Sequence, residues 1–191
     1  MVHRTDTRRR MLESAAELFR TQGYHATGMT QLVSESRAPK GSLYFHFPGG
    51  KEQLAAEAVR LSGERLAGQF GELTANAPDP ATAIERIVTA LAAALSESDF
   101  RSGCPIATVA LEATDSALIR EACEQGYESW LHHLSAYFTA HGLAEERAAS
   151  LATVVLSAVE GALLLARTRR DTAPMEAIAA HLHTTVEREF A

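Results

Sequence analysis

The chain has 191 residues and a mass of 20.6 kDa, with 46% apolar and 22% charged residues, which suits one globular unit or two small ones. Its net charge of -6 excludes a uniformly basic surface of the kind that binds nucleic acid regardless of sequence. The charge is uneven: residues 1–60 carry nine basic and six acidic side chains, a net +3, whereas residues 61–191 carry a net -9. This asymmetry indicates two regions with different partners.

A reduced, cytoplasmic location is expected because the chain has two cysteines, no CxxC spacing and no apolar signal core at its N-terminus. The longest apolar stretch, residues 154–166, is interrupted by Ser157, Glu160 and Gly161. It is shorter than the roughly 18 residues that a membrane span needs. We therefore expect no membrane insertion.

The whole chain is predicted to be α-helical, because Ala, Leu, Glu and Arg dominate and apolar residues recur at spacings of three and four. A first helix is predicted from residues 5–7 to Gly23, and a second from Thr27, as its N-cap, to residue 35. After a turn at 36–38, Pro39 suits the first position of a very short helix that ends near residue 45. Further helices are predicted at 51–75, 81–97, 105–113, 116–141, 144–168 and 174–190.

Residues 27–45 have the arrangement that lets a helix enter the major groove of DNA, namely two helices joined by a three-residue turn. A seven-residue helix is about 10 Å long, which fits a groove about 12 Å wide. The chain's two lysines, Lys40 and Lys51, both fall at helix beginnings beside this segment, where free backbone N–H groups also favour phosphate. On periodicity alone, a purely structural helical hairpin explains the pattern equally well.

The segment 7–60 resembles the DNA-binding domain of TetR-family transcriptional repressors. The resemblance rests on the separations of Phe19, Gly23 and Tyr24, and of Lys40-Gly41, Leu43-Tyr44, His46-Phe47 and Lys51-Glu52. The segment SGCPIATVALE at 102–112 and the Pro-Gly-Gly sequence at 48–50 resemble the LmrA/YxaF-type subgroup. Membership implies an all-α homodimer with a helix-turn-helix domain, expected at residues 1–50, and an effector-binding and dimerisation domain, expected at 51–191.

The resemblance implies that the turn, the short helix and the start of the next helix contact DNA. Lys40 would contact backbone or bases, Gly41 would allow close approach, and Ser42 would donate to phosphate or a base. The DNA-binding residues predicted in this way are Thr27, Arg37, Pro39, Lys40, Gly41, Ser42, Tyr44, His46 and Lys51. At the turn, Arg37, Ala38 and Pro39 stand where Gly, Val and Ser are frequent in the family. The resemblance therefore implies DNA binding but does not extend to the operator sequence.

Several neighbouring side chains have two interpretations. Leu43 and Phe47 are predicted to be core residues from their helical spacing. Phe45 is left open between core and surface. The arginines 8–10 either form a solvated face or follow the DNA backbone electrostatically.

An aromatic stripe along residues 119–138 indicates either ordinary core packing or a cavity for a small molecule. The predicted effector-binding residues are Cys104, Thr108, Cys123, Tyr127, Trp130 and Glu160. For Glu160, a structural or inter-subunit pairing is favoured over contact with a ligand.

The sequence predicts a regulator and no enzyme, because no catalytic motif is present and adjacent histidines on a helix point in different directions. No cofactor or metal is expected. The predicted partners are a palindromic double-stranded DNA operator, a small and largely apolar effector, and a second copy of the chain. Two alternatives stay open: a thiol-sensing regulator that uses its cysteines, and a helical small-molecule-binding module without DNA activity.

Overall fold

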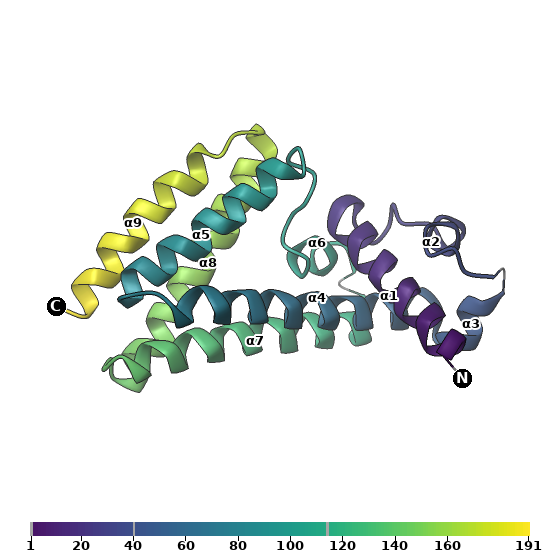
Figure 1. Ribbon diagram of the computed structural model, residues 1–191, viewed down its shortest axis with the longest axis horizontal. Helices are drawn as coiled ribbons and strands as arrows, with labels where there is room; N and C mark the ends of the chain where they lie inside the picture. Colours follow the sequence, from purple (N-terminus) through teal and green to yellow (C-terminus); the bar gives the residue numbers. More distant parts are fainter. Residues whose placement is uncertain (1, 40, 114) are drawn as a thin grey trace. The chain divides into compact units, whose positions relative to one another are not determined.

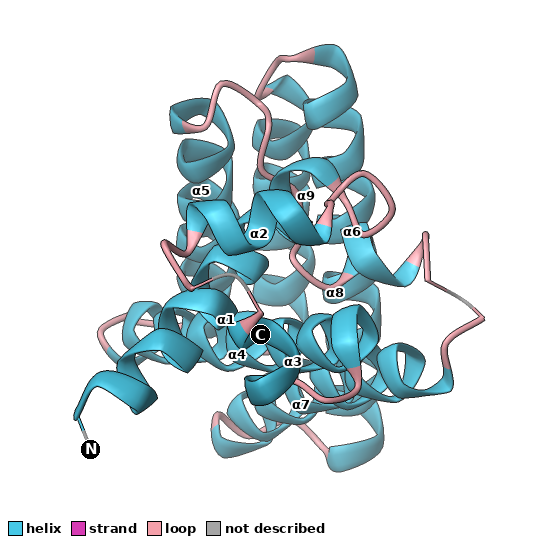
Figure 2. Ribbon diagram, turned by 90° about the vertical axis from the view of Figure 1, so that its right-hand side faces the viewer, coloured by secondary structure: helices cyan, strands magenta, loops and turns pink. Residues whose placement is uncertain are grey.

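The computed structural model describes residues 2–39, 41–113 and 115–191, with side chains described from residue 6 onward. All regular secondary structure in these residues is helical, which confirms the predicted all-α class (Figures 1 and 2). The helices are α1 (Val2–Gln22), α2 (Met29–Glu35), α3 (Ser42–His46), α4 (Gly50–Ala75), α5 (Pro80–Glu97), α6 (Ala107–Ala110), α7 (Ala117–Ala140), α8 (Glu145–Arg169) and α9 (Ala173–Glu189).

The contacts divide the chain into two units. Unit 1 contains residues 1–64 and 104–127, and unit 2 contains residues 65–103 and 128–191. Helices α4 and α7 each contribute residues to both units, so the division by contacts does not coincide with a break between helices. The functional boundary at residue 50 stays a prediction.

In unit 1, α1 packs against α2 and α6, and the core includes Met11, Phe19, Leu32 and Leu54. Helix α1 is already helical at Val2, earlier than predicted. Its end at Gly23 is confirmed: this residue has φ of +87° and donates its N–H to the Phe19 carbonyl at 3.0 Å. A left-handed glycine that closes a helix in this way directs the chain toward α2.

Thr27 does not cap α2, and that prediction was wrong. The N-cap is Gly28, which has no side chain to offer. The Thr27 hydroxyl instead donates to the Gly23 carbonyl at 2.7 Å and accepts from the Gln22 amide at 3.1 Å. The end of α1 therefore competes successfully for this hydroxyl, and the Thr27 side chain is 0% exposed.

Helix α3 begins at Ser42, so the prediction that Pro39 occupies its first position was also wrong. Gly41 precedes the helix in the left-handed conformation, with φ of +87°, and this interrupts any helical path from Pro39. The Ser42 N–H and hydroxyl both donate to the Pro39 carbonyl, at 3.1 and 2.7 Å. Pro39 consequently lies in a turn, and α3 spans five residues.

In unit 2, α9 packs along α5 and also contacts α8 (Figure 1). Helix α5 starts at a proline and is capped by Asp79, whose carboxylate accepts the Thr82 N–H at 2.7 Å. This hydrogen bond, with a second from the Thr82 hydroxyl, lowers the pKa of Asp79. Trp130 on α7 is buried, with its ring centroid 6.2 Å from that of Phe70 in an edge-to-face arrangement.

Helix α8 is long and apolar enough, by composition, to cross a membrane, with a mean hydropathy of 1.9 over its best window. By length and composition alone, one such helix is weak evidence for a membrane span. Core helices of water-soluble proteins pass the same test, and 39% of the window is buried within the protein. More than half of this window is not buried within the single chain, and Val154, Leu164 and Leu165 of α8 are exposed.

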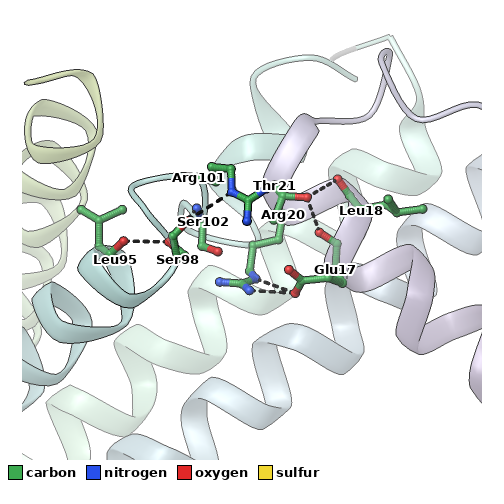
Figure 3. A network of polar contacts seen from close by, with 8 residues as sticks. All are labelled: Glu17, Leu18, Arg20, Thr21, Leu95, Ser98, Arg101 and Ser102. Atoms are coloured by element: carbon green, nitrogen blue, oxygen red, sulfur yellow. Dashed lines mark hydrogen bonds and ion pairs between the residues drawn. The ribbon is translucent and has the colours of Figure 1, made fainter. Parts of the chain in front are cut away.

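Side chains near the ends of two helices satisfy backbone groups there (Figure 3). The Thr21 hydroxyl, at the end of α1, donates to the Glu17 carbonyl at 2.8 Å. Beyond α5, the Ser98 hydroxyl donates to the Leu95 carbonyl at 2.7 Å and accepts the Ser102 N–H at 3.1 Å. These are local bonds from hydroxyl side chains to nearby backbone groups, and the Leu95 carbonyl also accepts the Phe100 N–H at 2.9 Å.

Candidate nucleic-acid interface

The turn after α2 is closed by two backbone hydrogen bonds. Ala38 donates to Val33 at 3.1 Å and Arg37 donates to Ser34 at 3.0 Å, which is the pattern of a Schellman helix end. The pattern places Arg37 in the left-handed region, with φ of +50°, where glycine is the usual residue. An exposed cation therefore stands at the turn that leads to α3.

The side chains of α3 separate into a buried and an exposed face. Leu43 and Phe47 are buried, as predicted. Tyr44 is 66% exposed and Phe45 is 60% exposed, so Phe45 is not a core residue. His46 is half-buried, and its ring meets the edge of the Phe45 ring at a centroid distance of 5.1 Å. Residues four apart share one face of a helix, and here that shared face belongs to the core.

Lys51 stands in the first turn of α4, and its Nζ lies 4.4 Å from the centre of the Tyr24 ring. Burial lowers the pKa of the Lys51 ammonium, and the Glu112 carboxylate opposes this effect. Burial, followed by the charge of Glu52, raises the pKa of the Tyr24 phenol. The cation–π contact fixes the direction of a long, flexible side chain.

Glu112 holds the turn between α1 and α2, a role that no sequence pattern indicated. Its carboxylate accepts the His25 N–H at 2.7 Å, and its carbonyl lies 2.7 Å from His25 Nε2. A Cβ atom on Gly23 would lie 2.1 Å from this carboxylate. A side chain on Gly23 would therefore displace the end of the Glu112 side chain, and the positive φ is the firmer reason for glycine at this position.

The N-terminal arginines form contacts within unit 1. Arg8 pairs with Glu57, and Arg10 pairs with Asp6. Arg9 is exposed and lies 3.9 Å from Glu13, the longest of the three pairs. All three arginines therefore have carboxylate partners within the chain, and Arg9 is the most exposed of them.

The predicted DNA-binding residues differ in what they can offer. Lys40 lies outside the described residues. Pro39 and Gly41 are exposed, and the Ser42 hydroxyl already donates to the Pro39 carbonyl. The structure brings the remaining predicted side chains to the turn, α3 and the start of α4 in unit 1, except for the buried Thr27.

The six predicted effector-binding residues do not fall in one unit. Unit 1 holds Cys104, Thr108, Cys123 and Tyr127, and unit 2 holds Trp130 and Glu160. The Thr108 hydroxyl donates to the Cys104 carbonyl at 2.8 Å. Two surface hollows of unit 2, one of about 560 Å³ between α8 and α9 and one of about 230 Å³ between α5 and α9, include none of the six. Among the described residues, no group of three or more His, Cys, Asp or Glu could hold a metal ion.

A left-handed turn, a short helix with one buried and one exposed face, and a cation at the next helix start define a helix-turn-helix regulator with an all-helical second region. The chain belongs to the TetR family of bacterial transcriptional regulators, and it binds DNA in that capacity. Residues 11–58 match the model for bacterial regulatory proteins of the tetR family, and residues 80–181 match the C-terminal domain of LmrA/YxaF-like transcriptional regulators. These matches confirm both resemblances and the expectation that the chain is not an enzyme.

Relatives of known sequence match along most of the chain. It is 38% identical over 171 residues to the HTH-type transcriptional regulator LmrA of Bacillus subtilis, covering 89% of this chain and 91% of that protein. It is 36% identical over 190 residues to the uncharacterized HTH-type transcriptional regulator YxaF of the same organism, covering 99% and 100%. A TetR transcriptional regulator from Chloroflexus aurantiacus has a similar structure, with a TM-score of 0.84, 28% identity and coverage of 99% and 98%.

Proposed function

We propose that this protein is a cytoplasmic repressor that binds a palindromic operator as a homodimer and is released by a small, largely apolar effector. The exposed face of α3 is the observation that carries the proposal. Tyr44 and Phe45 are exposed and His46 is half-buried, whereas Leu43 and Phe47 are buried in the core. A helix that offers polar and aromatic groups opposite its buried face is suited to the major groove.

The proposed contacts are side-chain contacts with phosphate and one close approach of the backbone. Tyr44, His46 and Lys51 bind phosphate oxygens, and Arg37 adds a cation at the turn. Gly41 has open space where a Cβ would stand, so the backbone there can approach DNA closely. Thr27 is left out of the set, because a side chain with no exposed surface has nothing to offer a phosphate.

The proposed dimer forms through α8 and α9. The hollow of about 560 Å³ between them is lined mainly by small and apolar residues, including Gly161 and Ile178. Leu164 is 58% exposed and Leu165 is 51% exposed on the same helix. An apolar face of this extent in a soluble regulator is suited to burial against a second copy.

The proposed effector acts by shifting the population of dimers between states that bind DNA and states that do not. An effector that binds the DNA-incompetent state 100-fold better would weaken the operator complex by about 2.7 kcal/mol. We propose that it contacts Tyr127 on α7, together with Cys104, Thr108 and Cys123 of the same unit. An effector role for Trp130 and Glu160, which fall in unit 2, stays a prediction from the sequence. The aromatic content of α7 supports a largely apolar molecule.

The cysteines do not favour the thiol-sensing alternative. Burial raises the pKa of the Cys123 thiol to about 11, which keeps it protonated at neutral pH and slows its reaction. Cys104 is also buried, and its sulfur accepts the Ala107 N–H at 3.4 Å. These two residues are suited to packing near α6 and α7.

The proposal is tested by selecting bound sequences from a random duplex library with the full-length protein. We expect a palindrome, bound at least about 1,000-fold more tightly than random duplex at physiological salt. Small apolar molecules are then screened for release of the selected duplex. Recovery of no preferred sequence would contradict the proposal, and so would binding of the operator by a monomer.

A further inference from the structure

We infer that Phe45 is a specificity-determining residue whose ring contacts the C5-methyl group of a thymine in each operator half-site. The inference rests on the proposed docking of α3 in the major groove. It adds a base-reading group to a helix whose other exposed side chains are placed to bind phosphate.

Phe45 lies on the side of α3 that faces away from the core. Successive residues in a helix are about 100° apart. Leu43 and Phe47 both point into the core, so Phe45, midway between them, points almost directly away from it. Tyr44 and His46 then project to opposite sides of Phe45. A helix lying in a groove would direct these two toward the flanking walls and Phe45 toward the bases.

The Phe45 side chain is apolar, which limits what it can recognise on DNA. A phenylalanine ring has no donor or acceptor with which to bind a phosphate oxygen or the polar edge of a base. In the major groove, the thymine methyl is the apolar group that distinguishes one base pair from the others. A ring that is 60% exposed at this point of α3 therefore has one kind of base feature that it can recognise.

The His46 ring lies against the Phe45 ring. An exposed phenylalanine is by itself unremarkable on a protein surface. Here the His46 ring meets Phe45 edge-on, with an interplanar angle of 78°, and limits the orientations available to it. A side chain whose orientation is restricted before binding loses less conformational entropy when it contacts a base.

The test removes the methyl group alone. Each thymine of the selected operator is replaced in turn by deoxyuridine, and affinity is measured for the wild-type dimer and for Phe45→Ala. We expect one thymine in each half-site at which replacement weakens wild-type binding about fourfold, or about fifteenfold when both half-sites are changed. Phe45→Ala should bind thymine and deoxyuridine duplexes at this position equally.

Tyr44→Phe is the matched control, because it removes a hydroxyl from the adjacent exposed ring and should leave sensitivity to the methyl group intact. Phe45→Leu is a second variant, and it should retain part of that sensitivity. The inference fails if wild type binds its operator but tolerates every replacement, or if Phe45→Ala keeps the wild-type sensitivity. Failure of wild type to prefer any duplex would instead overturn the proposed function, and the inference with it.

Discussion

Helices α3 and α8 both expose apolar side chains, but they expose different kinds. Helix α3 has five residues and presents aromatic rings beside polar groups, with Tyr44 and Phe45 exposed and the cation of Lys51 close by in sequence. Helix α8 has 25 residues and presents Val154, Leu164 and Leu165, which carry no polar atoms in their side chains.

The difference matches the partner that each helix is proposed to meet. Phosphates and base edges require hydrogen bonds and charge, so a DNA-facing helix needs polar atoms on its surface. A second protein copy removes water from a large apolar area, so aliphatic and small residues suffice there. The net charges of the two parts of the sequence, +3 for residues 1–60 and -9 for the rest, agree with this division.

The largest effect is expected on α8. A Cβ atom on Gly161 would meet nothing within 4 Å in this chain, so Gly161→Lys should fold normally. In the proposed dimer it would bury an unpaired charge, and the dimer should weaken at least about 100-fold. Analytical ultracentrifugation over a range of concentrations measures this change.

Gly68→Lys is the control for that experiment, because Gly68 on α4 has equally open surroundings and receives the same charge. It should dimerise like wild type. If Gly161→Lys dimerises as well as Gly68→Lys, the hollow between α8 and α9 is not the dimer interface. The exposed apolar face of α8 then has no assigned partner.

The second effect is expected beside α3. Lys51→Gln removes a proposed phosphate contact from each subunit, so affinity should fall about tenfold for operator and random duplex alike. The slope of log affinity against log salt should decrease by about 2, one for each subunit. Fluorescence anisotropy at several salt concentrations measures both quantities.

Arg86→Gln on α5 removes the same charge from an exposed position in unit 2 and serves as the control. Its salt slope should match that of wild type. An unchanged slope for Lys51→Gln would place Lys51 off the DNA, leaving its contact with the Tyr24 ring as a purely structural one.

The sequence predicted the helices well and their ends less well. Apolar residues at spacings of three and four locate long helices, because one face must be buried for a helix to persist. Thr27 and Pro39 were misassigned because several local arrangements compete for the same polar groups. Thr27 could cap α2 or bond back to Gly23, and in the folded chain its hydroxyl bonds to the Gly23 carbonyl at the end of α1.

The parts of the candidate site that depend on neighbouring residues in the sequence were predictable, and the part that depends on a distant residue was not. The burial of Leu43 and Phe47 follows from their spacing, and the same spacing could have placed Phe45 on the opposite face. Glu112 carried no such signal. Its contact with His25 joins residues 87 positions apart, and only the folded chain brings them together.

A smaller effect is expected at the start of α5 in unit 2. Asp79→Ala removes the N-cap of α5 and should lower the free energy of unfolding by about 1 kcal/mol at neutral pH, with DNA affinity unchanged. Because hydrogen bonds from Thr82 hold the pKa of Asp79 below 3.8, its contribution is present above about pH 4 and is lost as the pH falls through the folded pKa. The stability deficit of the variant should therefore shrink in acid.

Urea unfolding at pH 7 and at about pH 3 measures that deficit, with Asp79→Asn as the control that keeps a capping oxygen without the charge. A deficit that stays constant over this range would show that the cap acts through its geometry alone.

The smallest effect is expected at Arg37, where stability and DNA binding should change in opposite directions. A left-handed arginine costs about 1–2 kcal/mol, so Arg37→Gly relieves strain, but glycine also gives the unfolded chain about 0.4–1 kcal/mol of additional entropy. The net gain in stability should be about 0.5 kcal/mol, while loss of the cation weakens DNA binding a few-fold and reduces the salt slope. Arg37→Asn separates the two effects, because asparagine tolerates the left-handed region without adding backbone freedom, and its DNA affinity should match that of Arg37→Gly. If Arg37→Gly gains stability but binds DNA with wild-type affinity and salt slope, Arg37 is a strained helix end only, and the proposed DNA surface begins at α3.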